Sequence, residues 1–139
     1  MEIIRILILE DDLETVSVLY KMFFVLEETT DHKWDFAVTN LAEYTQVEEY
    51  VNKMEADHWD IILLDRDCKS CGSFHVLDFE KFMPEKIISI SSTSQWNEEA
   101  KERGVKRIVL KEFNNLEGFA SKVGEHIKIM IDQKNQKNE

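Results

Sequence analysis

The sequence predicts an α/β fold, in which a five-stranded parallel sheet is covered by helices on both faces. Two observations predict this class. Strand-like and helix-like segments alternate along the chain, strand first, five times. The internal strand-like segments are also continuously apolar, which is typical of parallel strands buried on both faces. The length of 139 residues suits one compact domain.

The predicted strands are short runs of apolar, often β-branched residues. Residues 3–9 (IIRILIL) and 60–64 (DIILL) are too short for buried helices, so we expect buried strands there. Residues 34–39 alternate as in a strand with one face buried. The fourth and fifth strands are expected at residues 86–91 and 106–110.

The segments between the strands carry helix signals. Apolar residues recur every three or four positions, and Ser73, Pro84 and Gly104 mark expected helix ends. The expected helices cover residues 13–27, 41–55, 73–82, 97–103 and 115–132. We therefore expect one domain over residues 1–132, followed by a disordered polar tail at 133–139.

Charge and composition exclude several classes of partner. The net charge of −11 repels phosphate backbones and anionic membrane surfaces, so we expect no nucleic-acid or membrane partner. No apolar run reaches the roughly 20 residues of a membrane helix, and the N-terminus does not resemble a signal peptide. The two cysteines, three positions apart, make no disulfide framework. These features predict a cytoplasmic protein with reduced thiols.

Polar residues follow four of the five predicted strands. Because the carboxyl ends of parallel strands meet at one edge of a sheet, these side chains are expected to lie together. They are Glu10, Asp11, Asp12, Asp65, Ser91, Ser92, Thr93 and Lys111. Asp12 is also expected to start a helix, because a carboxylate is favoured near the positive end of the helix dipole.

These residue types fit one chemistry. Crowded carboxylates repel one another unless a cation neutralises them, and an all-oxygen site suits Mg²⁺. A carboxylate such as that of Asp65 can act as a nucleophile toward a phosphoryl group. The phosphoryl oxygens then require positive charge and hydrogen-bond donors, which Lys111 and Ser91 can supply. The pattern predicts an aspartyl-phosphate site that uses Mg²⁺.

In this order and at these strand ends, the residues resemble those of response-regulator receiver domains, the CheY-like family of two-component signalling. The likeness covers residues 3 to about 131 and depends on the segments ILILEDD, DIILLD, IISISS and GVKRIVLKEF. It implies a doubly wound sheet in the flavodoxin-like strand order 2-1-3-4-5. It also implies a signalling switch that catalyses only its own phosphorylation and dephosphorylation.

The resemblance assigns roles to individual residues. It implies that Asp65 is the phosphoacceptor, and that Mg²⁺ is held by Glu10, Asp11, Asp65 and the main-chain carbonyl of Asp67. Glu10 would act through water.

The resemblance also makes Ser91 the switch hydroxyl and Lys111 the phosphate partner. The phosphoryl donor would be a histidine kinase or a phosphotransfer protein, and the output would go through a further protein partner.

The sequence departs from the family pattern near the surface that usually signals. Glu112 follows Lys111 where the family has a proline in a cis bond, so we expect a trans bond here. Ile108 stands where the family has an aromatic switch residue, and Lys69 stands where the loop usually has proline. These differences affect the expected output mechanism more than the phosphorylation chemistry.

Two alternative functions use the same residues. A degenerate receiver would bind partners without being phosphorylated. A haloacid-dehalogenase-like phosphatase would use Asp65 and Asp67 as an Asp-x-Asp pair, with Ser91 and Lys111. That family places this pair after its first strand, however, whereas Asp65 follows the third predicted strand.

A third alternative concerns Cys68 and Cys71, which form a C-x-x-C pair beside the predicted site, with His75 four residues later. The three side chains suggest either a zinc site or a redox pair, and the simpler interpretation is two reduced thiols in a loop. The cysteines and Ser92 are candidate modulators of phosphorylation.

Overall fold

Five parallel strands form the central sheet of the computed structural model, which describes residues 1–68 and 71–137. The strand order is β2-β1-β3-β4-β5, and every pairing is parallel. The strands are β1 (Glu2–Leu9), β2 (Trp34–Leu41), β3 (Ile61–Leu64), β4 (Ile87–Ser89) and β5 (Arg107–Ile108). The predicted fold class and strand order are therefore confirmed, although β4 and β5 are shorter than expected.

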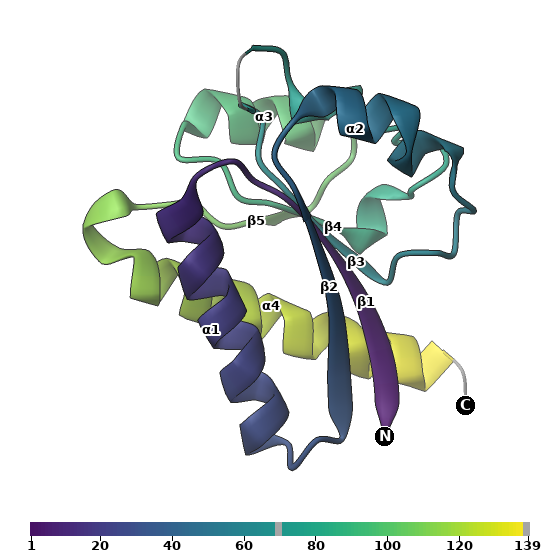
Figure 1. Ribbon diagram of the computed structural model, residues 1–139, viewed down its shortest axis with the longest axis vertical. Coiled ribbons are helices and arrows are strands. Elements are labelled where there is room, and N and C mark those ends of the chain that lie inside the picture. The colour runs from purple at the N-terminus through teal and green to yellow at the C-terminus, as the bar shows by residue number, and fades with distance from the viewer. Residues whose placement is uncertain (69–70, 138–139) are drawn as a thin grey trace.

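Two long helices cover one face of the sheet, which we call the regular face (Figure 1). They are α1 (Leu13–Thr29) and α4 (Leu116–Lys137), and they pack against each other. Ile4, Ile6 and Ile8 of β1 point into the core beneath them, because side chains alternate along a strand. The apolar residues that recur at helical spacing in α1 and α4 form the other side of this core.

Short elements cover the opposite face, which we call the irregular face (Figure 1). Its helices are α2 (Tyr44–Glu49) and α3 (Ser94–Glu102), with 3₁₀ turns at η1 (Val51–Lys53), η2 (Phe74–Val76) and η3 (Pro84–Lys86). Leu7 and Leu9 of β1 point into this second core. The two cores share the sheet but have different kinds of cover.

The helix expected at residues 73–82 is not formed. The structure has the single 3₁₀ turn η2 there, followed by turns. The Asn52 side chain bonds the carbonyl of Val76 (2.9 Å) and the amide of Asp78 (2.9 Å), and the Asp78 carboxylate accepts from the amide of Lys81 (3.0 Å). These bonds occupy backbone groups that a continuous helix would pair internally.

The helix expected at residues 41–55 is also shorter. β2 continues to Leu41, and α2 begins only at Tyr44, where the side chain of Gln46 accepts from the amide of the N-cap residue Glu43 (3.2 Å). The chain then passes directly into η1.

The helix α4 extends past residue 132, the expected end of the domain, and continues through residues 133–137. Gln133 accepts from Arg107 (3.0 Å), and Lys134 pairs with Asp60 (2.9 Å), so this end of the helix is tied to the sheet. Residues 138 and 139 lie outside the described part of the chain.

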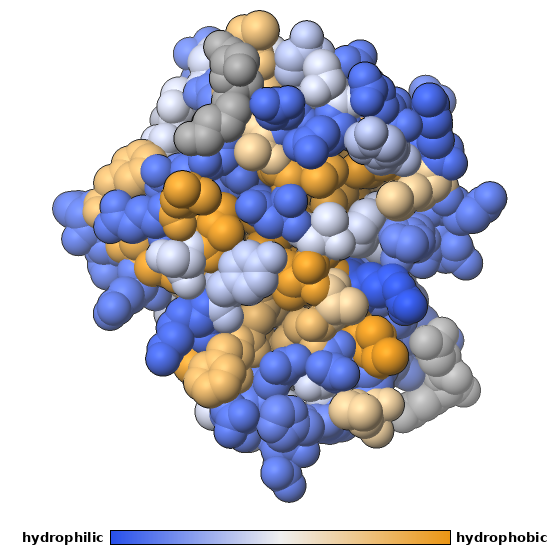
Figure 2. Space-filling model, viewed as in Figure 1, coloured by the Kyte–Doolittle hydropathy of each residue, from blue (hydrophilic) through white to orange (hydrophobic). Residues whose placement is uncertain are grey.

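The surface is largely hydrophilic on the side seen in Figure 2, with apolar residues in a broken band between two hydrophilic ends. This agrees with a charged content of 32%. Across the described residues, no helix combines the length and apolarity that crossing a bilayer would require.

Candidate functional site

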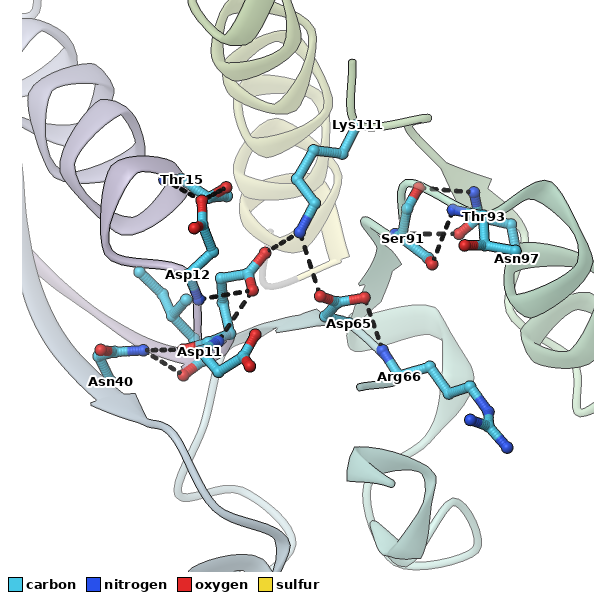
Figure 3. A network of polar contacts seen from close by, with 12 residues as sticks. Asp11, Asp12, Thr15, Asn40, Asp65, Arg66, Ser91, Thr93, Asn97 and Lys111 are labelled. Carbon is cyan, nitrogen blue, oxygen red and sulfur yellow. Dashed lines mark hydrogen bonds and ion pairs between the residues drawn. The ribbon is translucent and has the colours of Figure 1, made fainter. Parts of the chain in front are cut away.

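Three charged residues lie buried together at the carboxyl edge of the sheet, and Figure 3 labels two of them, Asp65 and Lys111. Glu10 follows β1, Asp65 follows β3 and Lys111 follows β5, with exposed fractions of 0%, 6% and 4%. The backbone holds them there, because the amides of Glu10 and Asp65 continue the sheet bonding to Leu41 (3.3 Å) and Leu9 (3.0 Å). The strand ends therefore bring together residues that lie 46 and 101 positions apart in the sequence.

The ammonium group of Lys111 bonds two buried carboxylates. Lys111 Nζ donates to Oε1 of Glu10 in a short hydrogen bond and to Oδ2 of Asp65 at 3.1 Å. Burial and the charge of Asp65 raise the pKa of Glu10 to about 8, although Lys111 acts in the opposite sense. Burial lowers the pKa of Lys111, but Glu10 and Asp65 raise it by more, so it lies above its ordinary value. The site is therefore short of positive charge.

The carboxylates fit a divalent cation that prefers oxygen. Oxygens of Glu10, Asp11 and Asp65 lie within 4.8 Å of one another, and within the described ranges they form the one such group of potential ligands. Glu10 and Asp65 also accept backbone bonds from Asp12 (3.1 Å) and Arg66 (2.7 Å), which fix their orientation. The half-buried Asp11 carboxylate accepts no hydrogen bond from any described residue. This donor set matches the chemistry of Mg²⁺.

Ser91 follows β4 and is 2% exposed, but its hydroxyl is not bonded to Asp65 in the described structure. Its Oγ instead accepts from the amide of Thr93 (3.1 Å). The buried amide of Asn97 in α3 holds the Ser91 backbone through two bonds, at 3.1 and 3.2 Å (Figure 3). Ser92 is exposed.

Sequence reasoning missed Asn97 and Asn40. Asn97 lies three residues before Ala100 on the buried side of α3, so a polar residue on an apolar helix face was the available signal. Asn40 donates to the carbonyls of Ile8 and Glu10, both at 3.1 Å, and ties β2 to the acidic loop. Asn40 carried no comparable signal in the sequence.

The helix-start role expected for Asp12 is confirmed. Asp12 is the N-cap of α1, and its carboxylate accepts from the amide of Thr15 at 2.9 Å.

Asp67 lies outside the buried cluster. Its side chain is 64% exposed and accepts from Nη1 of Arg66 at 3.2 Å. Arg66 also lies over the ring of Trp96 (3.9 Å) and beside the carboxylate of Glu99 (3.4 Å). An exposed second aspartate does not favour the Asp-x-Asp phosphatase alternative, and the role of the Asp67 carbonyl stays a prediction.

The cysteine pair and His75 do not converge in the described structure. Cys68 Sγ donates to the carbonyl of Cys71 at 3.1 Å, and both thiols are free. Burial raises the pKa of Cys68, although a backbone bond from Tyr44 acts against this. His75 is buried and faces the carboxylate of Glu99 at 3.4 Å instead. This arrangement gives the zinc alternative no support.

The sequence departs from the receiver-domain pattern at Glu112, Ile108 and Lys69. The described residues contain no cis peptide bond, so the bond between Lys111 and Glu112 is trans as expected. Ile108 is half-buried and packs against the core of the irregular face. Lys69 lies outside the described residues.

Comparison with solved structures supports the fold. A phosphorylated cyanobacterial phytochrome response regulator, RcpA, aligns with a TM-score of 0.68 at 17% identity, covering 93% of this chain and 94% of that one. A receiver domain from Rhodospirillum rubrum aligns with a TM-score of 0.63 at 13% identity, covering 91% and 94%. The bacteriophytochrome response regulator AtBRR aligns with a TM-score of 0.58 at 19% identity, covering 89% and 94%.

The likeness is one of structure more than of sequence. No protein-family model matches the chain, and no curated protein is similar enough to count as a relative. The similar structures nevertheless cover most of both chains with the same sheet. The protein therefore has the fold of response-regulator receiver domains.

Proposed function

We propose that this protein is a phosphoacceptor receiver, which takes a phosphoryl group onto Asp65 with the help of Mg²⁺. The observation that carries this proposal is the buried cluster in which the Lys111 ammonium bonds the carboxylates of Glu10 and Asp65. Two acids and a lysine would be costly to bury at one sheet edge without a functional use for their charge.

The chain's own residues can perform the transfer. A carboxylate oxygen of Asp65 forms the bond to phosphorus as the bond between phosphorus and the donor's leaving atom breaks, and the leaving atom keeps the electron pair. Lys111 lies 3.1 Å from Asp65 and would balance charge on the phosphoryl oxygens. Ser91 accepts a bond at its Oγ, which leaves its hydroxyl proton available to a phosphoryl oxygen.

The metal would be held by Glu10, Asp11, Asp65 and the main-chain carbonyl of Asp67. When bound, Mg²⁺ supplies positive charge that offsets repulsion between Asp65 and an incoming phosphoryl group. The half-buried Asp11 carboxylate, free of other described bonds, is the residue best placed to accept it.

The donor would be a histidine kinase or a phosphotransfer protein in the cytoplasm, and the output would pass through a protein partner. Residues 1–132, with the rest of α4, would form the receiver domain. The protein would thus act as a signalling switch whose chemistry is limited to its own phosphoryl group.

The test is phosphorylation by a small-molecule donor. Wild type incubated with acetyl phosphate and Mg²⁺ should gain the mass of one phosphoryl group, and omission of Mg²⁺ should abolish the gain. Asp65→Asn should gain none, whereas the matched control Asp67→Asn should still be modified, because it keeps the main-chain carbonyl. A wild type that folds and binds Mg²⁺ but is never modified would instead support the degenerate receiver.

A further inference from the structure

A second concave site lies at the amino edge of the sheet, opposite the acidic cluster. Its volume is about 910 Å³, which suits an organic ligand rather than a single ion. Its walls come from the starts of β3 and β5, the segment that leads into β4, and the C-terminal half of α4. No residue of the proposed phosphorylation site lines it.

The cavity gathers positive charge in a protein whose net charge is −11. Among the described residues, four lining cations have no carboxylate partner: Lys86, Lys106, Arg107 and Lys137. The acidic lining residues are Asp57, Asp60 and Glu85, and Asp60 is already paired with Lys134 at 2.9 Å. Uncompensated positive charge therefore predominates in the lining.

Arg107 is the best-placed of these cations because neutral partners fix its guanidinium. Nη1 contacts Nδ1 of His126 at 3.2 Å, and Nη2 donates to Oε1 of Gln133 at 3.0 Å. Burial and the nearby Arg107 charge lower the pKa of His126, so this partner stays neutral. A guanidinium has five N–H donors, so others are left for a ligand.

Apolar side chains complete the cavity. Met130 and Ile131 of α4 line it beside Met83, which is 50% exposed at the rim. Methionine side chains adapt readily to the shape of a bound apolar group. The cavity thus combines an oriented cation with an adaptable apolar wall.

We propose that this cavity binds a small amphipathic organic anion. The anionic group, a carboxylate, phosphate or sulfonate, pairs with Arg107 and the neighbouring Lys106. The apolar portion lies against Met83, Met130 and Ile131. The proposal does not depend on phosphorylation of Asp65, so either can fail without the other.

The test uses 8-anilinonaphthalene-1-sulfonate, which joins aromatic rings to a sulfonate. We expect saturable binding at one site in calorimetry, with a rise in dye fluorescence. Decanoate should displace the dye, whereas decanol, with the same chain length and no charge, should not. Loss of the charged contact in Arg107→Gln should weaken binding about tenfold or more.

Matched variants separate this site from other surfaces. Arg5→Gln removes the same charge at an exposed position of β1, outside the cavity lining, and should bind as wild type does. Met83→Glu places an anion at the rim and should also weaken binding, which keeps the test decisive if Arg107→Gln does not fold. Undiminished binding in a folded Arg107→Gln or Met83→Glu variant, or equal displacement by decanol, would overturn the proposal.

Discussion

The two faces of the sheet are built in different ways. On the regular face, two helices of 17 and 22 residues bury periodic apolar side chains over the sheet. On the irregular face, α2 and α3 have 6 and 9 residues, and 3₁₀ turns fill the rest. The first face is held by repeated packing, whereas the second also depends on single bonds from side chains to the backbone.

Those single bonds come from a few residues. Asn52 bonds two backbone groups of the segment between β3 and β4, and Lys86 Nζ donates to the carbonyls of Ala56 and Trp59, both at 3.0 Å. Arg103 Nη1 donates to the carbonyl of His75 at 2.6 Å. We infer that a destabilising substitution in the regular face weakens the whole protein. A similar substitution in the irregular face should open only nearby residues, because short segments can open separately.

The largest expected effect comes from truncating one buried phenylalanine on each face. Phe82→Ala and Phe119→Ala should each lower the free energy of unfolding by about 3–5 kcal/mol, since both side chains are buried. Hydrogen exchange should show local opening of residues 73–86 in Phe82→Ala only. Phe119→Ala should lower protection throughout the protein. The comparison of faces would be wrong if both variants gave the same exchange pattern.

A smaller effect is expected when the polar support of the irregular face is removed. Asn52→Ala leaves the Val76 carbonyl and the Asp78 amide without their partner, so unfolding should become easier by about 2–3 kcal/mol. Urea unfolding measures this change. Asn114→Ala, at an exposed position, is the control and should alter stability by no more than about 0.5 kcal/mol.

The same contrast explains what could be predicted of the fold. The strands and the long helices follow from local apolar patterns, and both were found in the sequence. The segment 73–82 has apolar residues compatible with a helix, and bonds from the distant residues Asn52 and Arg103 help to select another conformation. Such long-range bonds leave no periodic signal along the chain.

The candidate site also has a part that the sequence could predict and a part that it could not. Glu10, Asp65 and Lys111 could be placed together because each follows a strand, and parallel strands share an edge. The sequence could not show that the Ser91 hydroxyl accepts from Thr93, or that Asn97 holds the Ser91 backbone. These contacts depend on how α3 docks, which no short pattern encodes.

The irregular face should also respond to acid through His75. Burial lowers the pKa of His75 below its ordinary value of 6.5, although Glu99 acts in the opposite sense. The unfolded chain therefore takes up a proton near pH 6.5 while the folded protein resists it, so the contribution of His75 is present above pH 6.5. It is lost as the pH falls through the lower folded pKa.

Urea unfolding at a series of pH values tests this dependence. Relative to wild type, His75→Asn should show a smaller loss of stability as the pH falls below 6.5. His32→Asn changes an exposed histidine with φ of 57°, a conformation that asparagine tolerates, and should keep the wild-type dependence. Parallel profiles for wild type and His75→Asn would rule out His75 as a source of acid sensitivity.

The smallest expected effect concerns the contact that joins the loop after Asp65 to the irregular face. The Arg66 guanidinium lies 3.9 Å from the ring centre of Trp96, and the Arg66 amide donates to Asp65 at 2.7 Å. A double-mutant cycle of Arg66→Met and Trp96→Leu should give a coupling energy of about 0.5–1 kcal/mol. A cycle of Arg66→Met with Trp34→Leu should give none, since Trp34 lies in the core of the regular face. A coupling near zero for Arg66 and Trp96 would mean that this stacking contact does not link the loop to α3, and would leave the ion pair between Arg66 and Glu99 (3.4 Å) as the link between them.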